Sequence, residues 1–351
     1  MRRAAIFAIL ALSAAPAAFG QALDAFPVDP AILRDIPEGF TLIDDIIVRA
    51  DQDRATYETN LWHSHIVPYA FDANVTQINK NRMVAAMAEI EAVANIKFIP
   101  RTTESDYLYC RSSTGNNSFV GRIGGAQTVN IVSWTYKFII VHELLHALGM
   151  WHEHQRTDRG FYVTVNYANM QAGTSGAFVT VPSALVYGPY DFESVMHYDP
   201  CSFSVCCPAG STCGCAGAEC YTIEALPQYA DQQSLMGQRT YLSDGDQAWL
   251  VFAYGERDCN GNNIHDYFDI QSGLLRDCNN NGAPDACEPG VALCPGDIDG
   301  SCATTAADFV ILAASFGASV PPGTSGDLNN DGLVTAADFT ILAADFGSTC
   351  P

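Results

Sequence analysis

The chain of 351 residues is long enough for one sizeable catalytic core followed by smaller modules. Its formal charge of -22 argues against nucleic acid and anionic membranes as partners. Its 13 cysteines fit an oxidising compartment.

The first residues have the pattern of a secretory signal. Two arginines precede the apolar stretch 4–15, which is too short to span a bilayer, and the small residues of 18–22 offer cleavage sites. No later stretch is apolar enough to cross a membrane. We therefore expect a signal peptide over 1–21 and a secreted, extracellular protein, free or associated with a surface, with no membrane span.

The next residues, 22–54, lack a strong periodic pattern and are expected to be a pro-segment. Beyond Trp62 the sequence takes on the pattern of a folded domain. Apolar residues at helical spacing predict a helix over 77–94, and alternating or β-branched runs predict strands. The expected strands are Ile66–Phe71, Lys97–Pro100, Tyr107–Cys110 and Gln127–Val132. Ser243 and the acidic residues that follow it, before the apolar stretch that ends at Tyr254, predict a capped helix that closes the domain. This mixture predicts an α+β domain.

The stretch that follows reads HELLHALGMWHE. On a helix, His142 and His146 share one face, Gly149 can end that helix with a positive φ, and His152 then supplies a third nitrogen. Three protein ligands leave a zinc position open for water, which is the catalytic arrangement. Glu143 lies between the two helical ligands, where its carboxylate can accept the proton of that water.

These residues resemble the astacin family of zinc endopeptidases, which belongs to the metzincins. Segments 101–107, 120–122, 125–127 and 152–159 also resemble astacin sequences, and a Glu directly after the third histidine is characteristic of the family. The resemblance covers roughly Trp62 to Tyr254. It implies a two-lobed catalytic domain with a twisted, mostly parallel sheet and a zinc helix.

The resemblance also implies roles for residues outside the zinc string. Met196 would form the Met-turn beneath the metal, and Tyr198 would bind zinc at rest and then hydrogen-bond the oxyanion. Glu153 would anchor the mature N-terminus. Asp45 is the candidate pro-segment latch over the metal, although its surroundings match the family pattern weakly. The strand 127–132 would be a cleft edge that pairs with an extended substrate.

The cysteines fall into Cys110 alone, six between 201 and 220, and six between 259 and 350. Disulfides confined to each large group would leave Cys110 free. The middle group could instead be a second zinc site, although no histidine lies inside it. Cys302 and Cys350 flank the last repeats and could join them.

Two loops within 257–290 place oxygen-bearing side chains at positions 1, 3, 5, 9 and 12, a pattern that suits calcium. They resemble thrombospondin type 3 repeats, and an Asn/Gly-rich linker is the alternative. The candidate ligands are Asp258, Asn260, Asn262, Asp266 and Asp269, then Asp277, Asn279, Asn281, Asp285 and Glu288.

A second duplicated unit, of loop and helix, occupies 291–351 and resembles type I dockerin. That resemblance implies calcium-dependent folding and a scaffold or cell-surface partner. The pairs Ala306-Ala307 and Ala336-Ala337 stand where dockerins often carry recognition residues. The resemblance therefore supports calcium-dependent folding better than it supports binding to a cohesin. The candidate calcium ligands are Asp297, Asp299, Ser301, Thr305 and Asp308, then Asp327, Asn329, Asp331, Thr335 and Asp338.

The sequence thus predicts a signal peptide (1–21), a pro-segment (22–54), an astacin-like zinc protease domain (55–256), thrombospondin type 3-like repeats (257–290) and a dockerin-like module (291–351). The expected function is a secreted, zinc-dependent endopeptidase made as a zymogen, which cleaves protein or peptide substrates with Glu143 as general base. An exopeptidase is one alternative. The other is a calcium-dependent adhesion or scaffold-docking protein that uses the protease fold as a carrier.

Overall fold

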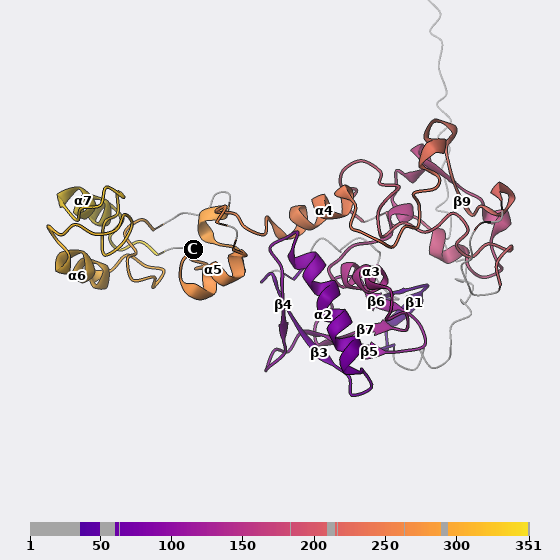
Figure 1. The fold of residues 1–351 in the computed structure, drawn as a ribbon, viewed down its shortest axis with the longest axis horizontal. Coiled ribbons are helices and arrows are strands. Elements are labelled where there is room, and N and C mark those ends of the chain that lie inside the picture. The colour runs from indigo at the N-terminus through magenta and orange to yellow at the C-terminus, as the bar shows by residue number, and fades with distance from the viewer. Residues whose placement is uncertain are drawn as a thin grey trace, which may run out of the picture.

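The computed structural model describes residues 36–49, 60–62, 64–182, 184–208, 215, 217–262, 264–288 and 294–349. The expected signal peptide and most of the pro-segment lie outside these residues. Helices α6 and α7 form one end of an elongated molecule, the region around β9 forms the other, and α5 and then the large sheet lie between them (Figure 1). In the part of the chain that the structure describes, no helix is both long and apolar enough to cross a membrane.

A seven-stranded sheet carries the catalytic region, in the order β1-β2-β6-β7-β5-β3-β4. Four of its six pairings are parallel, and β1–β2 and β6–β7 are antiparallel. The sheet is therefore mixed, with parallel pairings in the majority. Its strands are β1 Phe40–Ile43, β2 Ile46–Arg49, β3 Ile66–Phe71, β4 Lys97–Pro100, β5 Tyr107–Ser112, β6 Asn117–Phe119 and β7 Ala126–Ile131.

The strand order corrects one expectation. The strand predicted over 127–132 is β7, but it lies between β6 and β5 and so has no free edge for a substrate. On this side of the sheet, the short strand β6 is the outermost strand that comes after residue 60. Its free side pairs in parallel with β2, where Ile46 faces Ser118 and Ile47 faces Phe119. The hairpin of β1 and β2 was not predicted, and it covers this side of β6.

Two helices pack against the sheet through apolar faces. Helix α2 (Gln77–Glu91) begins at Thr76, whose side chain accepts from the Asn79 N–H, and it ends three residues earlier than predicted. Helix α3 (Lys137–Ala147) is buried along almost its whole length. The predicted helix end at Gly149 is confirmed, because its φ is 111°. The largest core cluster combines residues of both helices with β3, β5 and β7.

The second lobe has little regular structure and is held by aromatic packing and disulfides. Its core gathers around Phe178, Tyr190 and Tyr198. Cys201–Cys215 and Cys206–Cys220 are disulfides, so the alternative of a second zinc site there is wrong. The lobe contains β8 Val163–Val165, β9 Ile223–Ala225, and the 3-10 helices η2 Glu153–Gln155, η3 Arg159–Phe161, η4 Tyr167–Asn169, η5 Ser175–Phe178, η6 Ala218–Cys220 and η7 Pro227–Gln232.

Helix α4 (Asp244–Tyr254) closes the catalytic region, and its predicted cap is confirmed. The Ser243 hydroxyl accepts from the Asp246 N–H, while the Asp246 carboxylate accepts from the Ser243 N–H. Asp246 is fully buried, so this cap points into the protein and not to solvent.

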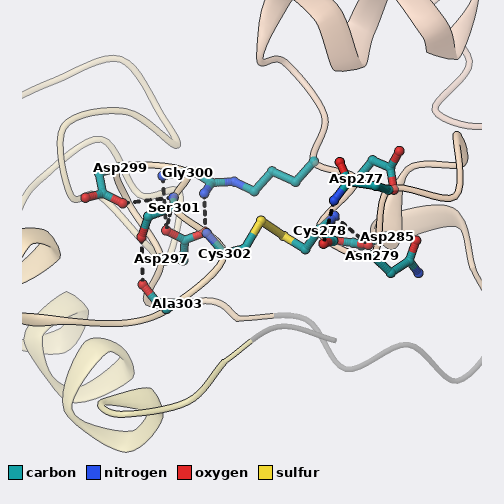
Figure 2. The surroundings of a disulfide bond; sticks show 12 residues. Asp277, Cys278, Asn279, Asp285, Asp297, Asp299, Gly300, Ser301, Cys302 and Ala303 are labelled. Atoms are coloured by element: carbon teal, nitrogen blue, oxygen red, sulfur yellow. Dashed lines mark hydrogen bonds and ion pairs between the residues drawn. A yellow bond between two sulfur atoms is a disulfide. The ribbon is translucent and has the colours of Figure 1, made fainter. Parts of the chain in front are cut away.

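The C-terminal region contains α5 Asp266–Ser272, the 3-10 helix η8 Asp285–Cys287, α6 Ala306–Ala314 and α7 Ala336–Asp345. Cys278 and Cys302 form a disulfide that ties the second repeat loop to the first loop of the terminal module (Figure 2). Pairing of Cys302 with Cys350 was therefore wrong. An ion pair from Arg276 to Asp297 crosses the same junction.

The repeats also attach to the catalytic region. The Asn95 side chain donates to the Gly282 carbonyl at 3.1 Å, and His265 Nε2 lies 3.2 Å from the Ile96 carbonyl. The Lys97 ammonium lies 5.3 Å from the centre of the Phe268 ring. These contacts involve the chain between α2 and β4, so the repeats are anchored at the β4 side of the sheet, away from β6.

Candidate active site

Three imidazoles converge where the motif HELLHALGMWHE predicted a metal. The Nε2 atoms of His142, His146 and His152 lie 3.1, 3.2 and 3.3 Å from one another. His142 and His146 project from one face of α3, and the turn at Gly149 returns the chain so that His152 joins them. All three side chains are buried.

The other ring nitrogens fix how these imidazoles are protonated. His142 Nδ1 lies 2.8 Å from the Val195 carbonyl, and His146 Nδ1 lies 2.7 Å from the Met150 carbonyl. A carbonyl oxygen only accepts, so each Nδ1 carries the proton and each Nε2 presents a lone pair. Burial and the neighbouring histidines lower the pKa of His146, so it is neutral at physiological pH.

These residues fit a zinc ion. Two nitrogens bound tetrahedrally at about 2.0–2.1 Å stand roughly 3.3 Å apart, close to the spacing found here. Three lone pairs pointing at one another repel unless a cation lies among them. The nitrogens and a carboxylate oxygen of Asp45 all lie within 4.8 Å of each other, as a single ion requires.

Glu143 lies beside this cluster with an unused acceptor. Its carboxylate is 1% exposed, and its Oε2 atom has no hydrogen-bond partner among the described residues. A buried, unpaired carboxylate oxygen is costly unless water or a ligand completes it. Burial, and then the charges of Asp45 and Asp44, raise the pKa of Glu143 well above its ordinary value.

The turn between β1 and β2 places two carboxylates over the site. Asp45 Oδ2 lies 3.1 Å from His142 Nε2, and Asp45 Oδ1 lies 3.1 Å from His152 Nε2. Burial alone would raise the pKa of Asp45, but the two imidazoles hold it well below its ordinary value. Its neighbour Asp44 accepts a hydrogen bond from the Tyr198 hydroxyl. The contact of Asp44 was not predicted.

Tyr198 lies beside the third imidazole, and Met196 precedes it by two residues. Met196 is fully buried in the main core and donates its N–H to the Ser194 hydroxyl. The Tyr198 ring is 4.7 Å from the His152 ring and 3.9 Å from the His154 ring, measured between centroids. The phenol therefore belongs to the same site, although its hydroxyl donates to Asp44 and not to the imidazoles.

Glu153 lines a cavity of about 320 Å³, to which His152 also contributes. Its carboxylate accepts from Arg156 at 2.9 Å and from the Asp191 N–H at 2.8 Å. Burial raises its pKa to about 8, although Arg156 lowers it. Asp246 lines the same cavity, which is therefore rich in carboxylates.

The expected calcium ligands lie together in four loops. The first two loops close on their own carboxylates; for example, the Asn260 and Asn262 amides both donate to Asp269. In the terminal module, the carboxylates of Asp297, Asp299 and Asp308 lie close together. The remaining candidates occupy equivalent places: Asp258 and Asp266; Asp277, Asn279, Asn281, Asp285 and Glu288; Ser301 and Thr305; Asp327, Asn329, Asp331, Thr335 and Asp338.

Sequence reasoning missed the residues that hold the ligands in place. Asp246 accepts from the Ser194 hydroxyl at 2.7 Å and from the Val195 N–H at 2.8 Å, and the Val195 carbonyl binds His142. Gln155 Oε1 lies 3.2 Å from His152 Nδ1. The capping pattern at Ser243 pointed to Asp246, but nothing in the sequence tied that cap to the metal site.

Three buried imidazoles beside a carboxylate with a free oxygen define a metallohydrolase type of centre. The chain belongs to the astacin family of peptidases, whose family model matches residues 54–255.

The chain is also similar to individual known proteins. The chain is 40% identical over 147 residues to zinc metalloproteinase nas-12 of Caenorhabditis elegans, a match that covers 41% of this chain and 38% of nas-12. The chain thus spans well under half the length of that curated relative. Among solved structures, it is similar to high choriolytic enzyme 1, a hatching enzyme zinc-protease from Oryzias latipes, with 30% identity, a TM-score of 0.48, and coverage of 55% of this chain and 90% of that one. A type II cohesin-dockerin domain from Bacteroides cellolosolvens matches 16% of this chain and 92% of that one, at 41% identity and a TM-score of 0.15.

Proposed function

We propose that this chain is a secreted zinc endopeptidase that cleaves extended protein substrates. The observation that carries the proposal is the convergence of three imidazoles beside Glu143, whose buried Oε2 has no partner among the described residues. The disulfides among the described cysteines suit an exported protein. The proposed protease domain runs over 55–256, close to the extent of the family match.

The residues would divide the reaction as follows. His142, His146 and His152 would hold the zinc, which when bound polarises the substrate carbonyl and acidifies a water. Glu143 would take the proton of that water and later deliver it to the leaving amine. Once the pro-segment and its two aspartates have left, burial would still raise the pKa of Glu143, which favours delivery of the proton in the second step. The Tyr198 hydroxyl would donate to the oxyanion.

We infer that the chain is made as a zymogen. Asp45 contacts the same Nε2 atoms that would bind the metal, so its carboxylate occupies the place that a water or substrate would need. Strand β2 also takes the pairing side of β6. A substrate strand cannot use either position until the pro-segment leaves. Glu153, in its carboxylate-rich cavity, would then receive the ammonium of the new N-terminus.

The C-terminal modules are proposed to bind structural calcium at the four loops and to choose where proteolysis happens. Oxygen-bearing side chains at matching positions of both loop pairs support this. The modules would join the protease to a scaffold or cell-surface partner, and the bounds proposed for them are 257–290 and 291–351.

The test uses the full chain after removal of the pro-segment. The activated protein should digest a denatured protein and should lose that activity with a zinc chelator. Glu143→Gln should lower the rate by about 10²–10⁴-fold, since that is the usual contribution of a general base. Glu193→Gln is the matched control, because Glu193 contacts Tyr241 at the surface. Equal rates for the two variants would refute the role of Glu143. Product masses from one long peptide would distinguish internal cleavage from an exopeptidase.

A further inference from the structure

Asp44 directly precedes Asp45, the proposed metal latch. Asp44 is not a metal-cluster residue: its Oδ2 accepts the hydroxyl of Tyr198, whose side chain is almost fully buried. The tyrosine ring is fixed by packing against His154, Phe178 and Phe203. The two adjacent carboxylates therefore engage different parts of the site, Asp45 the imidazoles and Asp44 the phenol.

The backbone at Asp44 supports a role for its side chain. Its φ is 59°, in the left-handed region that glycine adopts most easily. In extended chain, successive side chains point to opposite sides, and this left-handed residue allows both carboxylates to reach the same site. Glycine would make the same turn without that backbone cost. A carboxylate at this position is thus disfavoured by the backbone and favoured by its contact with Tyr198.

We propose that Asp44 is a second latch of the pro-segment, which acts on Tyr198 and does not need the metal. This rests on the proposed zymogen function. While Asp44 accepts the phenol hydrogen, that hydrogen is not available to an oxyanion, so the pro-segment disables two catalytic groups by separate contacts. Asp45 depends on a cation among the imidazoles, whereas the bond between Asp44 and Tyr198 remains when the metal is removed.

The experiment measures binding of a synthetic peptide of residues 36–49 to the activated full chain by calorimetry, in zinc-loaded and zinc-free forms. The peptide change Asp44→Gly removes the carboxylate and keeps the turn, and the chain change Tyr198→Phe removes the donor. Each should weaken binding about ten- to a hundredfold in both forms, as expected when a buried polar group is left without its hydrogen-bond partner. The two changes together should weaken it no further than either alone. Asp45→Asn in the peptide is the matched control and should weaken binding chiefly in the zinc-loaded form.

The outcomes separate the two proposals. If Asp45→Asn weakens binding and Asp44→Gly leaves it within twofold, the second latch is wrong and the zymogen proposal stands. If the effects of Asp44→Gly and Tyr198→Phe simply multiply, the two groups are not partners and the second latch is also wrong. Failure of the unaltered peptide to bind either form would overturn the pro-segment proposal, and the role of Asp44 with it.

The same cycle can be measured within the intact zymogen by thermal unfolding. There the cycle cancels the backbone effect of glycine, because the Asp44→Gly change is present with and without the hydroxyl of Tyr198. A shift of the unfolding temperature on Asp44→Gly that is equally large in the Tyr198→Phe background would overturn the proposal. A shift that nearly disappears in that background is the expected result.

Discussion

Asp246 offers the sharpest test of how the metal ligands are held. Although it belongs to α4, it binds the Ser194 hydroxyl and the Val195 N–H, and the Val195 carbonyl orients His142. Asp246→Ala removes the acceptor of both groups and of the Ser243 N–H. Each buried donor left without a partner costs about 1–3 kcal/mol, so we expect a loss of at least about 3 kcal/mol in the free energy of unfolding.

The variant should also bind zinc more weakly. A partner that orients a metal ligand usually contributes about 10–100-fold to affinity, and here the link runs through one peptide unit. Zinc affinity is measured by competition with a chelating dye, and stability by urea unfolding of the metal-free chain. Asp244→Ala is the control, because Asp244 lies in the first turn of the same helix but is exposed. If the two variants match in zinc affinity, the proposed link from α4 to His142 is refuted.

Four further results are expected. Burial raises the pKa of Glu153 from 4.5 to about 8. Between these pH values the folded zymogen binds more protons than the unfolded chain, so its stability should fall as pH rises. Glu153→Gln should flatten the slope of unfolding temperature against pH. The buried Cys110 thiol, whose pKa burial raises to about 12, should resist iodoacetamide until the chain is unfolded, and labelling of the native protein would contradict this. Removing zinc with a chelator should lower the unfolding temperature of the mature protein, because the ion stabilises only the folded chain. Asp338→Ala should speed hydrogen exchange at the Leu328 N–H even without calcium, because Asp338 accepts that hydrogen bond directly; unchanged exchange would count against it.

The elements predicted correctly are those encoded over short distances. The spacing of apolar residues gave α2, and the positive φ at Gly149 ends the zinc helix as expected. The capping pattern at Ser243 gave the start of α4. In each case the signal lies within one or two turns of chain, where sequence spacing and spatial proximity agree.

The errors come from contacts between distant residues. The place of β7 inside the sheet depends on β6 and β2, which no local pattern connects. The pairing of Cys278 with Cys302 depends on how the repeats meet the terminal module. The β1–β2 hairpin did have a signal, since β-branched and aromatic runs flank the Asp-Asp pair. If the two runs had been interpreted as a hairpin, Asp44 and Asp45 would have been expected in its turn.

The attachment of the repeats bears on how this protein could be shortened. The family match ends at residue 255, yet Asn95 and Ile96 find partners beyond it, in Gly282 and His265. The nearly buried Asn95 would lose its acceptor in a chain that stopped at the match. The region that matches the family therefore ends before the region whose contacts stabilise the catalytic domain, which extends to Gly282. A truncated protease should express less well and open first between α2 and β4, far from the chemistry that defines the family.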